Sequence, residues 1–189
     1  MIFSLLVALV AVAYALLRGG SIEKLLSTHF RFPLVLFAGL AVSTVFDLWN
    51  PSWLGRAGGV GVMVLSQTLV AAFLAINWRL PGMRMAVLGL VMNVMVIGLN
   101  GAMPVSATAA RIAGLDELGD MGLEHELLTR DTLLPFLGDV IPLPFTERIV
   151  SIGDIVLALG IGRFTYSAAV GKELHQEPEN GSVPVGESS

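Results

Sequence analysis

The strongest constraint in this sequence is a set of five long apolar stretches with very few charged side chains. They lie at residues 1–17, 33–48, 59–78, 83–99 and 149–166. A helix needs about 20 mostly apolar residues to cross a hydrocarbon core of about 30 Å, and about 17 is the lower limit. Only 14% of the residues are charged, whereas soluble domains carry about 25%. The sequence therefore predicts an all-α fold, a polytopic transmembrane helix bundle with about five spans.

The first stretch has two interpretations, a cleaved signal peptide or a retained helix. Ala13-Tyr14-Ala15 resembles a cleavage site. A secretory signal, however, begins with basic residues before its apolar core, and here Met1 to Ser4 carry no charged side chain while Arg18 follows the stretch. The order of charges favours a retained helix whose N-terminus lies outside.

The basic residues predict the orientation, because Lys and Arg are retained on the cytoplasmic side of a membrane. Alternate loops on one face carry Arg18, Lys24, Arg31, Arg79, Arg84, Arg163 and Lys172. The opposite face carries Arg56, Arg111, Arg130 and Arg148, spread over a longer length of chain. We expect a multi-pass protein of the plasma membrane with its N-terminus outside and its C-terminus in the cytoplasm.

The charge pattern also predicts the domain organisation. Residues 1–171 read as one transmembrane domain, with an outer acidic segment at 100–148 between the fourth and fifth stretches. Residues 172–189 are rich in Glu, Pro, Gly and Ser and have little apolar content. Such a segment cannot repay the entropy cost of folding, so we expect a disordered cytoplasmic tail.

The segment 133–145 is apolar but cannot form a regular spanning helix. It contains three prolines and Asp139 within thirteen positions, and a proline inside a helix removes a hydrogen bond and clashes with the preceding turn. Short apolar segments of this length are often re-entrant or interfacial. We expect either a broken re-entrant element that builds a polar pocket on the outer side, or an interfacial cover over the bundle.

Two carboxylates, Asp139 and Asp154, lie in similar short sequences, Leu-Gly-Asp-Val-Ile and Ile-Gly-Asp-Ile-Val. Carboxylates at membrane depth are costly and therefore mark candidate functional sites. If the segment 133–145 folds back against the last helix, the two acids approach and share a proton or a cation. The alternatives are structural: Asp154 completes a capping box with Ser151, and Asp139 satisfies backbone groups in a turn.

Asn93 and Asn100 extend this candidate polar site, because residues seven apart lie near one face of a helix. Ser66, Gln67 and Thr68 are further polar residues of the third stretch. Polar side chains within membrane helices either line a polar path or form hydrogen bonds between helices. Both interpretations remain open for Asn93 and Asn100.

The sequence excludes several classes of chemistry. The absence of cysteine excludes disulfides, thiol nucleophiles and cysteine-ligated metals. None of the three histidines has a second histidine three or four positions away, and we read His125, between Glu124 and Glu126, as part of a solvated acidic face. The net charge of −4 argues against nucleic-acid binding. We expect no cofactor and no metal.

Three motifs resemble those of a known family. They are Asn100-Gly-Ala-Met-Pro104, Leu137-Gly-Asp-Val-Ile-Pro-Leu-Pro144 and Ser151-Ile-Gly-Asp-Ile-Val156. They are similar to recurring motifs of a bacterial membrane-protein family of unknown function, and the resemblance covers nearly all of residues 1–170. It implies a single integral-membrane unit and brings no activity, cofactor or catalytic residue.

Two functions fit these observations. The first is a non-enzymatic module, a small transporter or a membrane-complex subunit, with a polar site on its outer face. Its expected partners are the lipid bilayer and either another membrane subunit or a small polar ligand or cation. The alternative is an intramembrane enzyme that uses Asp139 and Asp154 on a lipid-linked substrate. Its weakness is the small number of basic residues, Arg111, Arg130 and Arg148, that could hold a phosphate near the outer face.

Overall fold

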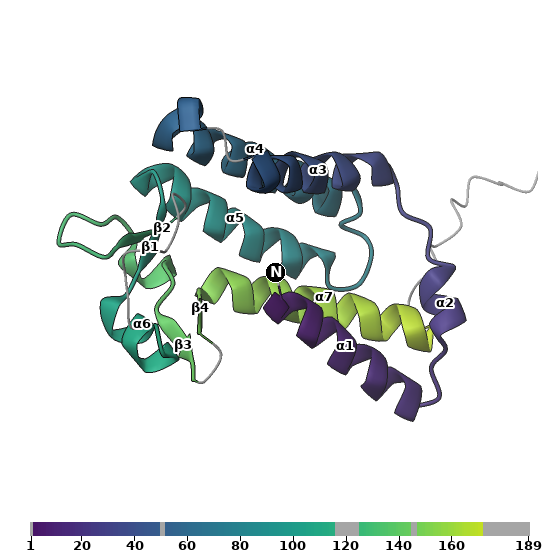
Figure 1. Cartoon of the computed structure of the whole chain (residues 1–189). Helices are drawn as coiled ribbons and strands as arrows, with labels where there is room; N and C mark the ends of the chain where they lie inside the picture. Colours follow the sequence, from purple (N-terminus) through teal and green to yellow (C-terminus); the bar gives the residue numbers. More distant parts are fainter. Residues whose placement is uncertain (1, 50–51, 116–124, 145–146, 172–189) are drawn as a thin grey trace, which may run out of the picture.

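A computed structural model describes residues 2–49, 52–115, 125–144 and 147–171 of the chain (Figure 1). The predicted cytoplasmic tail lies outside the described residues. The α-helices are α1 (Ile2–Leu17), α2 (Ile22–Leu26), α3 (Pro33–Trp49), α4 (Gly55–Ile76), α5 (Met83–Asn100), α6 (Ala107–Ala113) and α7 (Ile152–Val170). The strands are β1 (Met103–Val105), β2 (His125–Leu127), β3 (Ile141–Leu143) and β4 (Arg148–Val150), and 3-10 turns lie at Ser52–Leu54 and Pro135–Leu137.

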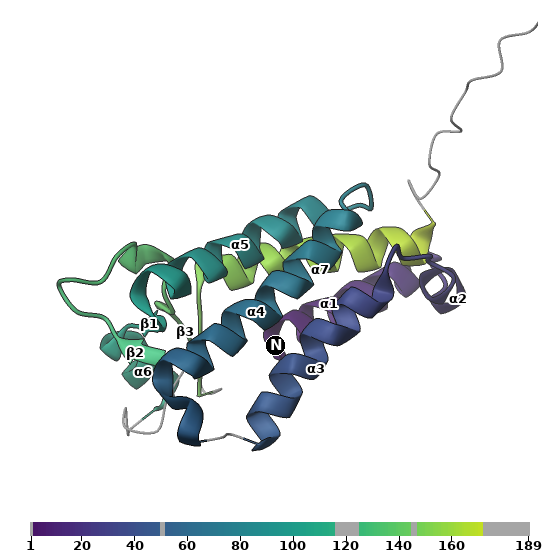
Figure 2. The same ribbon diagram turned by 90° about the horizontal axis from the view of Figure 1, so that it is seen from above.

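The five long helices pack side by side in the order α3, α4, α5, α7, α1 (Figures 1 and 2). Helix α5 runs antiparallel to α7, and α1 runs parallel to it. The short helix α2 lies against α7 at one end of the molecule, and the two small sheets and α6 lie at the other end. All five long helices coincide with the apolar stretches of the sequence.

The prediction of five membrane spans is not supported. Among the described residues, two helices are long and apolar enough to cross a membrane, α4 over Ala57–Ile76 and α5 over Met83–Asn100. Helix α1 has 16 residues and α3 has 17, which gives lengths of about 24 and about 26 Å against a core of about 30 Å. Helix α7 has 19 residues, but Asp154, Arg163 and its hydroxyl side chains lower its mean hydropathy.

The prediction of an all-α fold is also incomplete, because the described residues between α5 and α7 form two small sheets. Strand β1 pairs with β2 in parallel, with Met103 opposite His125. Strand β3 pairs with β4 in antiparallel orientation, with Pro142 opposite Ile149. The prolines that prevent a helix here are tolerated in two-stranded sheets, where each strand has a free edge. We call the described residues 101–115, 125–144 and 147–150 the cap.

Two clusters of buried apolar side chains hold the molecule together. One lies among the long helices and consists of Phe73, Leu74, Met83, Ala86 and Leu90. The other joins the cap to the end of α5 and consists of Val96, Ile97, Met103 and Leu137. The second cluster contains Leu137, two residues before Asp139, and thereby anchors the segment 133–145 to α5.

Glycines bring α5 and α7 into direct backbone contact. A Cβ atom at Gly89 would collide with the backbone of Gly153 and Leu157, and one at Gly160 would lie 2.7 Å from the carbonyl oxygen of Gly82. Small residues of this kind let neighbouring helices approach closely. The contact continues to Asn93, whose side chain occupies the space beside Gly153. The packing of α5 on α7 therefore places Asn93 at the N-terminus of α7.

Candidate functional site

The N-terminus of α7 carries a hydrogen-bonded group of polar side chains. Ser151 is the N-cap, and its Oγ accepts a hydrogen bond of 2.9 Å from the Asp154 backbone N–H. In return, Asp154 Oδ2 accepts a hydrogen bond of 3.1 Å from the Ser151 N–H. This reciprocal pair is the capping box that the Ser-x-x-Asp spacing indicates. Asp154 therefore caps the N-terminus of α7, as the structural interpretation of its sequence predicts.

Asn93 links the capping box of α7 to the neighbouring helix α5. Its Nδ2 donates a hydrogen bond of 2.8 Å to Asp154 Oδ1, and its Oδ1 accepts one of 3.0 Å from the Ser151 hydroxyl. Both Asn93 and Ser151 are buried. Each oxygen of Asp154 thus has a donor, so Asp154 is held in one orientation by two helices.

The cap holds Asp139 by its backbone. The Asp139 N–H donates to the Pro104 carbonyl at 2.8 Å, and the Asp139 carbonyl accepts from the Ser106 N–H at 2.9 Å. These bonds form a parallel bridge beside Val105 at the end of β1. Gly138 permits this approach, since a Cβ there would collide with the Pro104 carbonyl. The Asp139 side chain is consequently fixed in the interior, with only 7% of the residue exposed.

The Asp139 carboxyl group is incompletely satisfied. Its Oδ2 lies 3.7 Å from His125 Nε2, beyond hydrogen-bond distance. Its Oδ1 is buried and has no hydrogen-bond partner among the described residues. Burial, together with the nearby charge of Asp154, raises the pKa of Asp139 to about 7. Asp139 can therefore gain or lose a proton near neutral pH.

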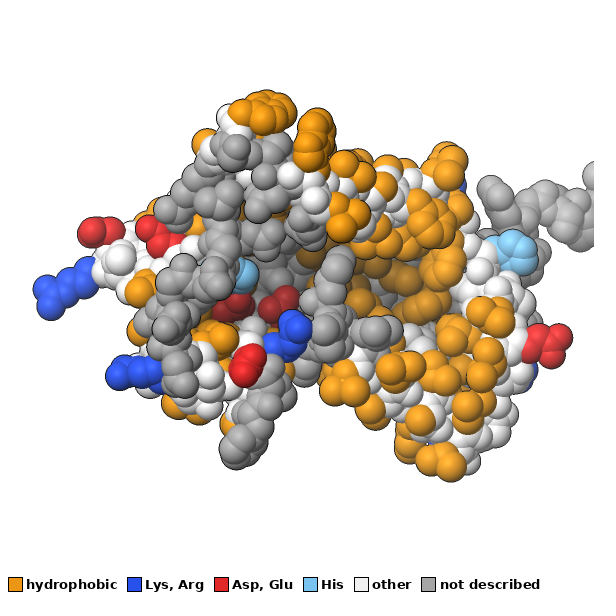
Figure 3. Space-filling view, in the orientation of Figure 1, with side chains coloured by type: hydrophobic (Ala, Val, Ile, Leu, Met, Phe, Trp, Pro, Cys, Tyr) orange, Lys and Arg blue, Asp and Glu red, His pale blue; other side chains and the backbone are white. Residues whose placement is uncertain are grey.

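We call Asp139, His125, Asp154, Asn93 and Ser151 the polar site. It lies where the cap meets the start of α7 and the end of α5, two helices in direct backbone contact. In the space-filling view, charged and histidine side chains gather at this boundary, while hydrophobic side chains cover the helices (Figure 3). The charge of Asp154 is the second cause of the raised pKa of Asp139, after burial. That the two acids share a proton or a cation stays a prediction.

Asn100 forms structural hydrogen bonds, one of the two interpretations that its position in the sequence allows. Its Nδ2 donates to the carbonyls of Val96 and Leu133, at 2.8 and 2.9 Å. Its Oδ1 accepts from the Leu133 N–H at 2.8 Å. Asn100 therefore fastens the start of the segment 133–145 to the end of α5, and none of these bonds reaches the polar site. Ser66 likewise joins two helices, donating from its Oγ to the Gly39 carbonyl at 2.8 Å.

His125 is a member of the polar site for which the sequence favoured a solvated acidic face over a weak cation site. It lies in β2 and is brought to Asp139 by the parallel pairing of β2 with β1. The pairing joins segments more than twenty positions apart in the sequence, and no local motif predicts it. Its acidic neighbours in the sequence instead indicated a solvated position, whereas the His125 side chain is only 33% exposed.

The described residues contain no group of three or more His, Asp or Glu side chains that could hold a metal ion. Asn93, Ser151 and Asp154 already satisfy one another, and Asp139 is the member with an unused oxygen. The chemistry available at the polar site is therefore binding of a proton, or of a donor or cation, by one carboxyl group.

Comparisons with known proteins give a family without an assigned function. An uncharacterised protein of Thermotoga maritima is 29% identical over 101 residues, which cover 51% of this chain and 58% of that protein. The chain thus spans little more than half the length of this relative. No solved structure matches the chain. The model of a family of unknown function, DUF5317, matches residues 27–166, about three quarters of the sequence, and the chain belongs to this family.

Proposed function

We propose that this chain is an integral membrane protein, not an enzyme, whose polar site exchanges a proton on Asp139 for a small cation or cationic ligand. The observation that carries the proposal is the buried Oδ1 of Asp139, which has no hydrogen-bond partner among the described residues. An unsatisfied buried polar atom is unfavourable and calls for a physical explanation. A ligand that donates a hydrogen bond to this oxygen, or that carries positive charge, would satisfy it.

The surface of the long helices supports membrane embedding. Only 22% of Ala57–Ile76 and 39% of Met83–Asn100 are buried inside the protein, whereas a core helix of a soluble protein is mostly buried. Large apolar side chains are exposed along the bundle, among them Leu9, Phe37, Leu65, Leu88 and Leu159. Exposed apolar surface of this extent requires a covering, and lipid provides it.

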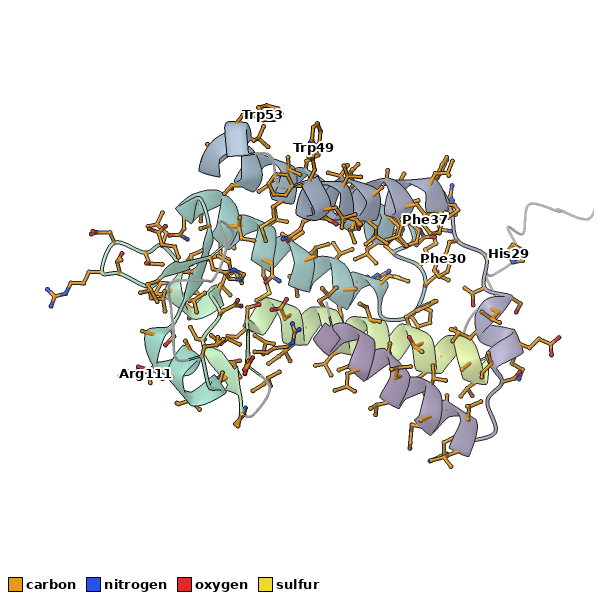
Figure 4. All side chains as sticks on the ribbon, in the orientation of Figure 1. His29, Phe30, Phe37, Trp49, Trp53 and Arg111 are labelled. Carbon is orange, nitrogen blue, oxygen red and sulfur yellow. The ribbon has the colours of Figure 1, made fainter. Side chains whose placement is uncertain are left out.

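The proposed orientation has the cap outside and α2 in the cytoplasm. It follows from the excess of Lys and Arg in the loops at the α2 end. Trp49 and Trp53 project outward from the helix ends nearer the cap (Figure 4), and both are largely exposed. Tryptophans are enriched where membrane meets water. In this orientation the polar site faces the outer side.

The pKa of Asp139 suits exchange of a proton. At a pKa of about 7, the acid is neutral in roughly half of the molecules at neutral pH. Arrival of a cation favours the ionised form and releases the proton. The ligand therefore binds more tightly as the pH rises through 7, and the proton competes with it below that value.

The enzymatic alternative has less structural support. An acid and base pair requires two carboxyl groups that are free to transfer protons, but both oxygens of Asp154 already accept hydrogen bonds. Arg111, Arg130 and Arg148 are all exposed, and Arg111 lies on α6, away from the long helices (Figure 4). The arrangement favours one titrating acid over a catalytic pair.

The test is proton release by the purified full-length protein in weakly buffered detergent solution. Alkali, alkaline-earth and organic ammonium cations are added one at a time while a pH-sensitive dye reports released protons. We expect at least one cation to release protons from the wild type and from Asp131→Asn, a matched exposed acid of the cap. Asp139→Asn releases none. Equal release by Asp139→Asn would contradict the proposal.

Proteoliposomes then separate the two forms of the module. A transporter carries protons across the membrane when a gradient of the active cation is imposed, and a pH dye in the lumen records it. A subunit that only binds the cation leaves the lumenal pH unchanged. For a transporter, Asp139→Asn abolishes the lumenal pH change; for a binding subunit, it abolishes only the proton release measured in detergent.

A further inference from the structure

A basic pocket lies at the end of the bundle opposite the cap, near the connection between α4 and α5. Its lining includes Trp78, Arg79, Gly82, Arg84, Met85 and Arg163, and its volume is about 390 Å³. Arg79 and Arg84 come from this connection and the start of α5, whereas Arg163 comes from α7. Three guanidinium groups from distant parts of the sequence therefore share one cavity.

A glycine contact builds this pocket. Gly82 has a φ of +84°, in the left-handed region that favours glycine, and a Cβ there would collide with the Gly160 carbonyl and lie 2.9 Å from the Phe164 N. The connection between α4 and α5 therefore rests directly on the backbone of α7. Arg163, which follows Gly160 by three positions, comes to lie beside Arg79 and Arg84 for this reason.

The positive charge in the pocket has no counter-charge among the described residues. No ion pair joins Arg79, Arg84 or Arg163 to a described carboxylate, and all three side chains are exposed. Helix α5 has no acidic residue in its first turn. The Arg84 guanidinium stacks on the Trp78 ring, 4.9 Å from its centroid, which orients the group without neutralising it. Three like charges around one cavity repel one another, and an anion would relieve this repulsion.

We propose that this basic pocket binds the phosphate headgroup of an anionic membrane lipid. Guanidinium groups recognise phosphate oxygens through paired hydrogen bonds, and basic pockets between membrane helices are typical headgroup sites. The apolar surface beside the pocket argues for a lipid: Trp78 is 53% exposed, Met85 37%, and Leu88, one turn further along α5, 55%. Acyl chains can follow this surface while the phosphate stays in the pocket. The site is separate from the polar site and depends only on membrane embedding.

Trp78 serves as a local reporter. In a Trp49→Phe, Trp53→Phe background it is the single remaining tryptophan of the chain. The full-length protein is placed in phosphatidylcholine nanodiscs containing a small fraction of brominated phosphatidylglycerol or, for comparison, the same fraction of brominated phosphatidylcholine. Bromine quenches tryptophan only at close range, so the ratio of the two quenching strengths measures preference for the anionic lipid.

We expect stronger quenching by brominated phosphatidylglycerol. Arg79→Gln and Arg163→Gln should each lower the preference about fivefold, the effect of one basic group near a membrane surface. Arg31→Gln removes the same charge from another exposed position at the α2 end and should leave the preference unchanged. Both pocket variants change exposed side chains, so folding is retained, and circular dichroism verifies it.

Three outcomes would overturn the proposal. The first is equal quenching by the two lipids. The second is a preference for phosphatidylglycerol that Arg31→Gln lowers as much as Arg163→Gln, which indicates general attraction of the surface. The third is displacement of the anionic lipid by inorganic phosphate at low concentration, which identifies a soluble phosphate compound as the occupant.

Discussion

At the scale of single residues, the raised pKa of Asp139 makes the stability of the protein depend on pH. In the unfolded chain this acid has its ordinary value of 3.8, and in the folded protein the pKa is about 7. Between these values the folded state binds more protons than the unfolded state, so the free energy of unfolding falls as the pH rises. Above pH 7 both states are ionised and this contribution becomes constant.

Asp139→Asn should remove this dependence, because the amide does not titrate. From about pH 4 to about pH 7, we expect the free energy of unfolding of the wild type to fall by at most about 4 kcal/mol. Thermal unfolding in detergent should therefore occur at lower temperature as the pH rises. The curve for Asp139→Asn should be flatter and should lie above that of the wild type at pH 8. Wild-type and Asp139→Asn curves of the same slope would show that another group carries the dependence.

Asp154 distinguishes a helix cap from a member of the polar site. Asp154→Asn keeps an acceptor oxygen and should cost about 1 kcal/mol of stability. Asp154→Ala leaves the Asn93 Nδ2 and the Ser151 N–H without their acceptor and should cost about 1–3 kcal/mol. Because the Asp154 charge raises the pKa of Asp139, both variants should also move the Asp139 titration to lower pH. If Asp139 titrates at the wild-type pH in both variants, Asp154 only caps helix α7 and does not belong to the polar site.

The sequence predicts residue roles where the partners are local. Ser151 and Asp154 are three positions apart, and their reciprocal hydrogen bonds follow from that spacing. The bond from Asn93 to Asp154 joins residues 61 positions apart, and the proximity of His125 to Asp139 depends on the pairing of β1 with β2. Neither contact follows from local patterns, since each requires the packed tertiary structure.

At the scale of secondary-structure elements, the contact between α5 and α7 depends on glycine. Gly89→Ala would place a methyl group on the backbone of Gly153 and Leu157, and such overpacking costs about 1–3 kcal/mol. Gly98 of the same helix has no heavy atom within 4 Å of an added Cβ. Gly98→Ala should therefore stabilise the helix, by about 0.5–1 kcal/mol. Denaturant unfolding in detergent measures the free energy of unfolding of each variant, which should be lower than the wild type for Gly89→Ala and higher for Gly98→Ala.

The same pair of variants tests whether the helix contact positions the polar site. Separation of α5 from α7 moves Asn93 away from Asp154, so Gly89→Ala should also change the pH dependence that Asp139 produces. Gly98→Ala should not. A Gly89→Ala protein as stable as the wild type would refute the close backbone approach of the two helices.

Long apolar stretches made the five long helices predictable, whereas the elements of the cap were not predicted. Helix α6 has a sequence signal, the N-cap Ser106 and the left-handed Gly114 at its end, but its seven residues lie within a segment read only as acidic. The strands have three residues each, too few for an alternating pattern. Their formation depends on partners across the cap.

At the scale of the whole molecule, composition indicated a membrane protein, and two of the described helices, α4 and α5, are long and apolar enough to cross a membrane. The number of spans was predicted less well, because apolar content alone does not fix helix length. Helices α1 and α3 end before the length of a full span, and α7 combines Asp154 with Arg163. The sidedness rests on the positions of Lys and Arg.

The most direct test of the account is therefore the sidedness of the two ends of the molecule. The chain has no cysteine, so Thr108→Cys on α6 and Ser27→Cys beside α2, both exposed positions, can each be probed alone with a membrane-impermeant thiol reagent. We predict that Thr108→Cys is labelled in intact cells and that Ser27→Cys is labelled only after permeabilisation. Labelling of both in intact cells, or of neither until permeabilisation, would place the two ends on one side and contradict a membrane-spanning protein with an outward polar site.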